Sequence, residues 1–549
     1  MKAHLLYRDQ DFDWRWALQA AAVREETRSG RRYQRPEFDG EAGLPWNGRA
    51  LTADLGLDTI FTAMALGDDC VFEVARKVIL AGTSGDLATI DYRQRVLQDC
   101  LNHPAVVREL YAIAVEAMEK QRGHFLGVLA RYPDTVLRDS IELLTKMLGL
   151  LRRLRAVAEA HAHEFASQGW TEFFAMLERE LGDDYLAVAE RHLEQLKFRS
   201  GLFLLSADLG PANKARRYVL HQAPFQGWGW WARLQAWWMS RFAPKGPVYG
   251  FTLHPRDEAG FKALAELRNR GISLVADALG QSADHVRNFF GMVRTELAFY
   301  VGCVNLHERL AGKGEPLCLP VAAAARERRL SFRGLCDAGL ALGVESRVVG
   351  NEANADGKDL LLITGANSGG KSTFLRGLGL AQLMMQSGMF VVAESFCGSL
   401  CEGLFTHFKR EEDASMESGK LDEELSRMSE IVDHIAPDSL ILFNESFAAT
   451  NEREGSEIGR QIMSALLEKR VRIACVTHLY ELAHGFYDGA GAKALFLRAP
   501  RQQDGGRPFK LIEGEPLPTS FGPDLYNSIF AEDAAAPASG EDKARARAV

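Results

Sequence analysis

One short stretch constrains this chain more than any other. Residues 361–375 read LLITGANSGGKSTFL, an apolar run followed by a glycine-rich loop and then by residues suited to a helix. The spacing of Gly365, Gly370, Lys371 and Ser372 is the pattern of a phosphate-binding loop. It predicts a strand over Leu360–Thr364, a helix over Thr373–Gln386 and a nucleoside triphosphate between them.

Each residue type in the loop has its own chemistry. Small residues let backbone N–H groups surround phosphate oxygens. Lys371 is expected to reach the β- and γ-phosphates of ATP, and the Ser372 hydroxyl to ligand Mg²⁺. The alternative is a glycine turn that touches no ligand. The predicted nucleotide-binding residues of the loop are Gly365, Ala366, Asn367, Ser368, Gly369, Gly370, Lys371, Ser372 and Thr373.

A second apolar run ends in two polar residues. Ser439–Glu445 is typical of a buried parallel strand, and its end is where a P-loop ATPase keeps its metal-side and water-activating carboxylates. Glu445 is therefore the candidate general base. Asn444 is the second candidate metal residue, but it stands where an aspartate would help to hold Mg²⁺. Because an amide carries no charge, we expect lower metal affinity or turnover.

A third apolar run, Val471–Val476, leads into Thr477 and His478. A polar pair at the carboxyl end of a strand is suited to sensing a γ-phosphate. A histidine in such a place is more often structural when it stands alone. In the company of the other two motifs, His478 is predicted to be a catalytic-site residue.

Three stretches in a fixed order resemble one family. Residues 365–376 read GANSGGKSTFLR, residues 443–455 read FNESFAATNEREG, and residues 476–482 read VTHLYEL. In this order they resemble the ATPase domain of the MutS family, which comprises DNA mismatch repair ATPases and their relatives. The resemblance implies an ATP- and Mg²⁺-dependent ATPase that binds DNA.

Smaller stretches agree with this resemblance. MFVVAE at 389–394 resembles the strand after the P-loop helix, Thr450 and Gly455 match the loop after the acidic pair, and residues 520–522 resemble the family's Ser-Tyr-Gly. The resemblance covers roughly Leu330–Phe530. It is weaker outside the ATPase domain.

The resemblance also implies a dimer. In this family a serine at the start of a helix in one subunit completes the ATP pocket of the other. The similar segment here reads DASMES at 413–418, and Ser418 is our choice for that serine. Ser415 is a competitor, and a plain helix N-cap role for either serine is an equally good interpretation.

The N-terminal part is expected to differ from mismatch-reading relatives. Those begin with a mismatch-reading domain and a connector domain, which the roughly fifty residues before the first helical region cannot contain. Residues 82–111 instead resemble the start of the family's helical core and lever region. We therefore expect a MutS-related protein without the two N-terminal domains.

The expected fold class is multidomain, α plus α/β, with a helical core and lever region, a small clamp-like insertion and a C-terminal P-loop domain of the ABC type. The predicted domains are an N-terminal extension (1–55), helical core and lever (56–200), a clamp-like Trp and basic segment (201–255), returning lever and core helices (256–325), the MutS-type ATPase domain (326–530) and a disordered tail (531–549).

The clamp-like segment combines aromatic and basic residues. Basic side chains neutralise phosphates and indoles stack on unpaired bases, so DNA contact makes chemical sense. A small packed core is an equally good interpretation, and docking to a protein or a membrane is a third. The residues are Lys214, Arg216, Arg217, Trp228, Trp230, Trp231, Arg233, Trp237, Trp238, Arg241 and Lys245.

Composition, charge and cysteine pattern indicate which class of protein this is. The chain has 549 residues, of which 47% are hydrophobic and 25% charged, which is typical of globular domains. Its net charge of −8 means that DNA contact has to come from local basic patches. The 8 cysteines form no CxxC pair, and the sequence has neither a membrane-spanning run nor a signal-peptide core. We expect a cytoplasmic protein.

These features predict an ATP-dependent DNA-binding protein of the mismatch repair or recombination type, acting as a homodimer. Distorted, mismatched or branched DNA is the expected ligand, with a clamp whose motion ATP controls. The alternative is a nucleotide-regulated binding or scaffold protein with negligible hydrolysis, which Asn444 favours. An ATPase of the SMC type ranks third, because the sequence has no Leu-Ser-Gly-Gly-Gln motif and no long heptad arms.

Overall fold

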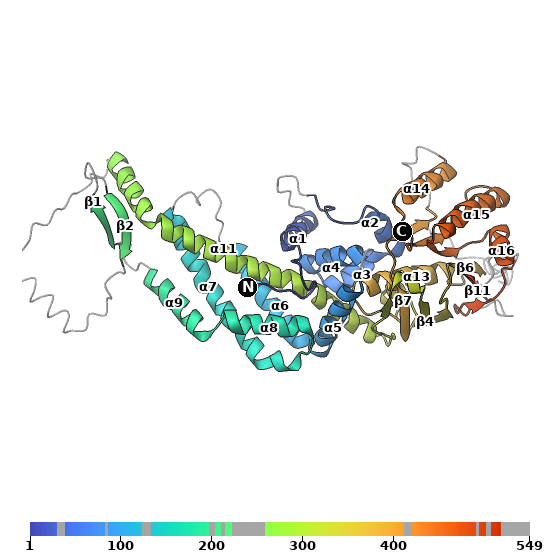
Figure 1. The fold of residues 1–549 in the computed structure, drawn as a ribbon, viewed down its shortest axis with the longest axis horizontal. Coiled ribbons are helices and arrows are strands. Elements are labelled where there is room, and N and C mark those ends of the chain that lie inside the picture. Colours follow the sequence, from blue (N-terminus) through green and yellow to red (C-terminus); the bar gives the residue numbers. More distant parts are fainter. Residues whose placement is uncertain are drawn as a thin grey trace, which may run out of the picture. The chain divides into compact units, whose positions relative to one another are not determined.

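The computed structural model describes most of the chain (Figure 1). It covers residues 1–29, 39–82, 86–122, 133–196, 204–209, 215–221, 258–410, 419–489, 493–500 and 507–517. The chain divides into two compact units. The first comprises Met1–Ala3, Ala105–Ala166 and Trp170–Leu297, and the second comprises His4–Pro104, Ser167–Gly169 and Ala298–Val549.

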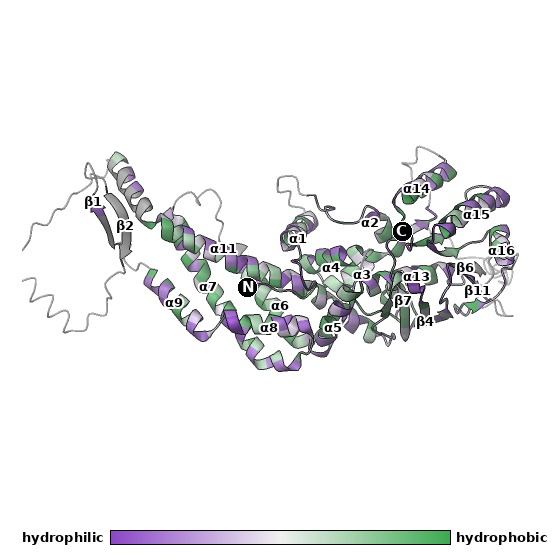
Figure 2. Ribbon diagram, in the orientation of Figure 1, coloured by the Kyte–Doolittle hydropathy of each residue, from purple (hydrophilic) through white to green (hydrophobic). Residues whose placement is uncertain are grey.

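The first unit is mainly helical. Its helices are α6 (Pro104–Arg122), α7 (Pro133–His161), α8 (Gln168–Glu180), α9 (Asp183–Leu196) and most of α11 (Glu258–Ala311). A proline opens α6 and α7, where its fixed φ suits the first helical position and its missing N–H removes no bond. Figure 2 shows hydrophilic and hydrophobic residues mixed along α7, α8 and α9, which is typical of helices that bury one face.

An aromatic cluster holds α8 in the first unit. Trp170 is fully buried and stacks on Phe174 with ring centroids 5.3 Å apart. Phe165 meets the Trp170 ring at 4.7 Å, and Phe173 meets it edge-on at 5.8 Å. Large buried aromatic rings contribute much of the apolar area of such a unit.

Within the predicted clamp-like segment, the structure describes two short strands. Strands β1 (Leu204–Leu209) and β2 (Ala215–His221) pair antiparallel, with Leu204 opposite His221. Lys214 and the five tryptophans of the segment lie outside the described residues, as do Arg233, Arg241 and Lys245. The clamp and its DNA contacts therefore stay predictions.

The second unit contains a six-stranded sheet in the order β12-β11-β6-β10-β9-β8. Every neighbouring pair is parallel except β11 with β12, which is antiparallel. The strands are β6 (Leu360–Gly365), β8 (Leu404–Phe408), β9 (Leu440–Asn444), β10 (Arg472–Val476), β11 (Ala494–Ala499) and β12 (Ile512–Glu513).

The apolar composition of these strands explains their central place. β6 and β10 are buried at every position, as expected for parallel strands covered on both faces. Helices α13 (Lys371–Gln386), α14 (Lys420–His434), α15 (Glu452–Glu468) and α16 (Tyr480–Gly489) belong to the same unit. Because β6, β10 and β9 are adjacent and parallel, the loops at their carboxyl ends meet at one edge.

A second, four-stranded sheet has the order β3-β7-β4-β5. Its strands are β3 (Val321–Ala323), β4 (Leu330–Leu335), β5 (Asn351–Asn354) and β7 (Ser395–Ser399), and the short helix α12 (Ala338–Gly343) follows β4. The coarse prediction, a helical region followed by mixed α/β structure, is confirmed. Among the described helices, none is both long and apolar enough to cross a membrane.

One strand prediction is wrong. Residues 389–394 form no strand, and only Val391 makes an isolated bridge, with Cys318. The strand follows at β7 instead. The segment is apolar because Met389–Ala393 is buried, and its backbone bonds go to single residues such as Cys336 and Arg333 instead of forming a ladder.

The N-terminal residues of the second unit fold onto its α/β part. They form α1 (Trp14–Ser29), α2 (Gly48–Leu55), α3 (Leu57–Ala65) and α4 (Asp69–Ala81), followed by α5 (Leu87–Asn102). The Asn47 amide donates to the Leu404 carbonyl of the outermost strand β8 at 2.8 Å, and Trp46 stacks on His434 of α14 at 4.2 Å. The Asn47 bond occupies a backbone acceptor of an edge strand that would otherwise be open to pairing.

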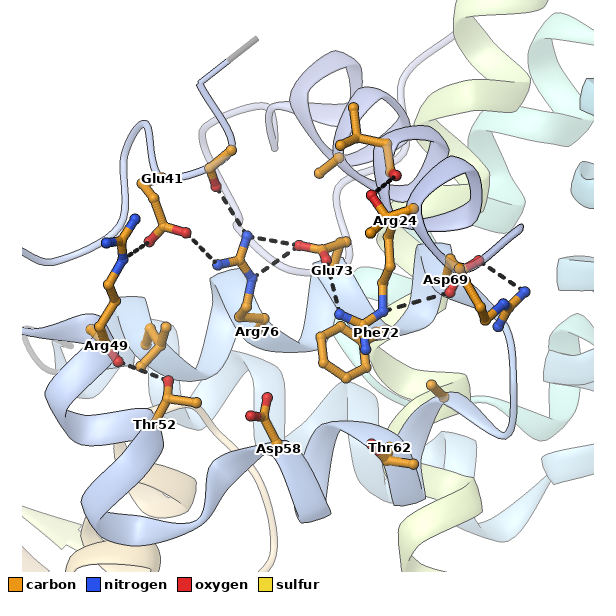
Figure 3. A pocket seen from close by; sticks show the side chains of 18 of the residues that line it. Arg24, Glu41, Arg49, Thr52, Asp58, Thr62, Asp69, Phe72, Glu73 and Arg76 are labelled. Carbon is orange, nitrogen blue, oxygen red and sulfur yellow. Dashed lines mark hydrogen bonds and ion pairs between the residues drawn. The ribbon is translucent and has the colours of Figure 1, made fainter. Parts of the chain in front are cut away.

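A chain of ion pairs fastens α1 and the segment before α2 to α4 (Figure 3). It borders a hollow of about 750 Å³. Arg76 of α4 lies between Glu41 and Glu73, 3.2 Å and 2.8 Å away. Arg24 of α1 lies 3.2 Å above the Phe72 ring centroid and within 3.8 Å of Glu73. The arginines around this hollow are thus engaged with carboxylates of the protein itself.

We expect Arg76→Ala to lower the free energy of unfolding by about 1–3 kcal/mol, because it leaves a buried carboxylate short of a partner. The side chain of Glu73 is only 6% exposed and that of Arg76 17%. Arg49→Ala is the matched control, since Arg49 is 84% exposed and 3.8 Å from Glu41, and should cost about 0.5 kcal/mol or less. Urea unfolding of both variants measures this, and equal losses would contradict it.

Candidate nucleotide site

The loop between β6 and α13 has the backbone shape that its glycines predict. Gly365 has φ +105°, and a Cβ there would lie 2.5 Å from the Ala499 carbonyl oxygen of β11. Gly370 has φ +86° and immediately precedes Lys371, the first residue of α13. Ser368, between them, has φ +56°. The helix therefore begins at the loop, so its N–H groups are directed toward a bound anion.

Lys371 is buried beneath the loop. Its Nζ donates to the carbonyl oxygens of Gly365 and Ala366 at 3.0 Å and 2.9 Å. Burial lowers the pKa of Lys371 to about 8, and the nearby Glu445 carboxylate opposes that shift. The ammonium group is thus kept at the base of the loop by two neutral acceptors that phosphate oxygens can replace.

Ser372 and Asn444, the two residues predicted to hold Mg²⁺, contact each other. The Ser372 hydroxyl donates to the Asn444 amide oxygen, Oδ1, at 2.9 Å. The two residues come from α13 and the end of β9. Mg²⁺ prefers oxygen ligands, so this donor set fits the ion, with the phosphates supplying the negative charge. Neither side chain is charged, and a weaker hold on the metal stays a prediction.

Glu445 and His478 meet at the ends of β9 and β10. His478 Nε2 lies 2.7 Å from Glu445 Oε1. The hydrogen bond to His478 lowers the pKa of the Glu445 carboxyl, against the opposing effect of its burial. Glu445 is therefore ionised at neutral pH, as a group that accepts a proton from water must be.

One cavity of about 820 Å³ joins these groups. Its lining includes Asn367–Thr373, Glu445 and His478. Apolar side chains also line it, namely Leu335, Leu340, Val344, Val348, Val349, Phe374 and Phe509, among polar ones such as Asp337, Ser346 and Arg347. Polar groups for phosphates and apolar side chains for a flat ring are what a nucleotide requires.

Three segments of the site were missed by sequence reasoning. Residues within 335–340 and 344–351, together with Phe509 of the segment 507–511, line the cavity from outside the three motifs. The Arg507 side chain donates to the Asn367 carbonyl at 3.1 Å, and Asn351 Nδ2 donates to the Phe509 carbonyl at 3.3 Å. No motif marks any of these segments, so only the fold brings them to the site.

The described part of the structure does not test every predicted site residue at the cavity. Ser415 and Ser418 lie outside the described residues, as does the segment 520–522. Gly365 and Ala366 contribute carbonyls to Lys371 without lining the cavity, and Asn444 joins the site through Ser372. The roles of all these residues stay predictions.

The pKa of Lys371 makes nucleotide binding sensitive to pH. Bound phosphates favour the charged amine and so raise this pKa from about 8. We therefore expect ATP affinity to fall as the pH rises above that value, and binding there to take up protons. Calorimetric titration near pH 8 in two buffers of different ionisation enthalpy measures the uptake. Equal heats in the two buffers would contradict the prediction.

Two family models match adjacent parts of this chain. The model of the MutS2 N-terminal domain matches residues 85–313, and the model of MutS domain V matches residues 361–524. The second match contains Lys371, Glu445 and His478 in the predicted order. The chain belongs to the MutS family.

Curated MutS relatives resemble parts of the chain. Endonuclease MutS2 of Thermus thermophilus is 35% identical over 123 residues, which are 22% of this chain and 16% of the relative. MutS protein homolog 4 of Mus musculus is 32% identical over 143 residues, 26% of this chain and 15% of the relative. Endonuclease MutS2 of Lacticaseibacillus paracasei is 29% identical over 241 residues, which are 42% of this chain and 30% of the relative. In each case the matched stretch spans less than a third of the relative.

Proposed function

We propose that this MutS-family chain binds ATP and hydrolyses it, and that hydrolysis is coupled to DNA binding. The observation that carries the proposal is the shared cavity. Lys371, Ser372, Glu445 and His478 all line it, and the last two are joined by a hydrogen bond. A phosphate anchor and an ionised carboxylate on one cavity are the parts that water attack on a γ-phosphate needs.

Each residue then has one role. Lys371 leaves the carbonyls of Gly365 and Ala366 and neutralises charge on the β- and γ-phosphates. Ser372 and Asn444 hold Mg²⁺, which when bound supplies positive charge to the phosphates. Glu445 orients the attacking water and accepts its proton. His478 keeps the Glu445 carboxylate in place and senses the γ-phosphate.

Family membership supports the DNA-binding half of the proposal. One matched relative, from Microcystis aeruginosa, is named DNA mismatch repair protein MutS. We propose that this chain binds distorted, mismatched or branched DNA through its predicted clamp, whose motion ATP controls. We further propose a cytoplasmic homodimer in which Ser418 of one subunit completes the ATP site of the other.

A second candidate function rests on Asn444. Its amide oxygen accepts from Ser372 where a charged carboxylate would hold Mg²⁺ more firmly. The chain would then be a nucleotide-regulated scaffold in which ATP selects a conformation and is hydrolysed negligibly.

DNA coupling is tested by steady-state ATP hydrolysis without DNA and with duplex, branched or single-stranded DNA, each at two salt concentrations. The proposal expects DNA to raise the rate, and the increase to shrink at high salt as phosphate contacts weaken. A rate that no DNA changes at either salt concentration would favour the scaffold.

A further inference from the structure

The turn that carries Glu445 has an unfavourable backbone conformation. Glu445 and Phe447 have φ values of +55° and +61°, a region that large side chains rarely adopt. Phe447 is also 2% exposed and lies so close to α15 that a Cβ on Gly455 would be 2.3 Å from its carbonyl oxygen. Such a turn persists only where the surrounding groups hold it.

A buried carboxylate from α14 holds one side of the turn. Glu424 Oε2 accepts the backbone N–H of Phe447 at 3.0 Å. Glu424 is only 4% exposed. Burial raises the pKa of this carboxyl, while the Phe447 N–H and the Arg427 charge oppose the increase. Glu424 is not among the residues that line the nucleotide cavity.

A buried histidine from β8 holds the other side. His407 is 0% exposed, and its Nε2 lies 2.9 Å from the Glu424 carbonyl while its Nδ1 lies 2.8 Å from Ser446 Oγ. Burial lowers the pKa of His407 to about 4, so the ring is neutral. Since a carbonyl can only accept, the single ring proton is on Nε2, and Nδ1 is an acceptor beside the Ser446 hydroxyl. That hydroxyl donates to the backbone carbonyl of His407 at 2.5 Å. The ring also stacks on Phe447 at 5.3 Å.

We propose that Glu424 and His407 are positioning residues that fix the Glu445 carboxylate by clamping the 445–447 turn to α14 and β8. This inference rests on the proposed hydrolysis of ATP and adds residues that the three sequence motifs do not include. The carboxylate and the backbone carbonyl of Glu424 both belong to α14, so a shift of this helix moves them together. The carboxylate bonds to the turn directly, and the carbonyl bonds to His407, which contacts the turn. The position of α14 therefore sets the rate of hydrolysis without altering the phosphate-binding loop.

The test is Glu424→Ala, with Glu424→Gln as the conservative variant. Loss of the acceptor frees the turn, and misplacing a catalytic group by about 1 Å costs on the order of 100-fold in rate. We expect kcat to fall about 10- to 100-fold in Glu424→Ala, with ATP affinity within about twofold of wild type. Glu424→Gln keeps an acceptor oxygen and should recover most of the rate.

Asp99→Ala is the matched control. Asp99 is a buried carboxylate on α5 that accepts the backbone N–H of Ser167 at 2.8 Å, and it does not line the nucleotide cavity. Its loss should reduce stability and leave kcat unchanged at a temperature where the protein is folded. Should Glu424→Ala fail to fold, Ser446→Ala removes the hydroxyl that contacts His407 Nδ1 and donates to the His407 carbonyl, and the same fall in kcat with unchanged affinity is expected.

Hydrogen exchange separates this inference from the proposed function. In nucleotide-free protein the Phe447 amide should exchange faster in Glu424→Ala than in wild type or Asp99→Ala. Unchanged exchange at Phe447 would overturn the clamp even if wild type hydrolyses ATP, and so would an unchanged kcat in the folded variant. A wild type without turnover would instead overturn the proposed function, and the exchange result would still decide whether the turn is clamped.

Discussion

Glu445→Gln is expected to lower the rate of ATP hydrolysis by about 10²- to 10⁴-fold, the usual contribution of a positioned general base. The amide cannot accept a proton from water, although it keeps the shape of the side chain. ATP affinity should change little, because Lys371 and the loop are untouched. Phosphate release and equilibrium binding of ATP, measured on the same preparation, separate the two effects.

Glu457→Gln serves as the control for this variant. Glu457 is half exposed on α15 and pairs with Arg460 at 2.6 Å, away from the cavity. Its replacement should leave both rate and affinity at the wild-type level. If Glu445→Gln hydrolysed ATP as fast as wild type, Glu445 would not be the base and the roles assigned to the pair with His478 would be wrong.

Lys371→Ala is expected to weaken ATP binding by about 10- to 100-fold, corresponding to the loss of a charge-assisted hydrogen bond. Hydrolysis should then be undetectable, because the phosphates lose the charge that anchors them. Lys493→Ala is the control, since Lys493 is 80% exposed and 4.0 Å from Asp359. Fluorescent-nucleotide titration measures both variants, and wild-type affinity in Lys371→Ala would contradict the assigned site.

The sequence predicted the strands and the helix around the loop well because their signals are local. An apolar run followed by closely spaced glycines can hardly form anything but a buried strand and a turn. β6 runs to Gly365 and α13 begins at Lys371, two residues before the predicted Thr373. The polar residues after β9 and β10 also follow their strands directly. Parallel pairing then brings them to one edge of the sheet.

The remaining parts of the site depend on contacts between distant residues. Residues 344–351 and 507–511 carry no motif. Arg507 reaches the loop by donating to the Asn367 carbonyl, and Asn351 joins the two segments by donating to the Phe509 carbonyl. His407 is an ordinary strand residue in the sequence, and only burial against Ser446 and Glu424 gives it a role. Residues 389–394 show the converse. The family resemblance predicted a strand there, but Met389–Ala393 is buried without belonging to a strand.

The central claim is that ATP bound in this cavity is hydrolysed there, and a single-turnover experiment tests it most directly. Excess purified protein is mixed with radiolabelled ATP and Mg²⁺, and the bound nucleotide is identified over time. We expect conversion to ADP in wild type, and ATP that is bound but intact in Glu445→Gln. Wild-type protein that binds ATP and never converts it would contradict the account and leave the nucleotide-regulated scaffold as its function.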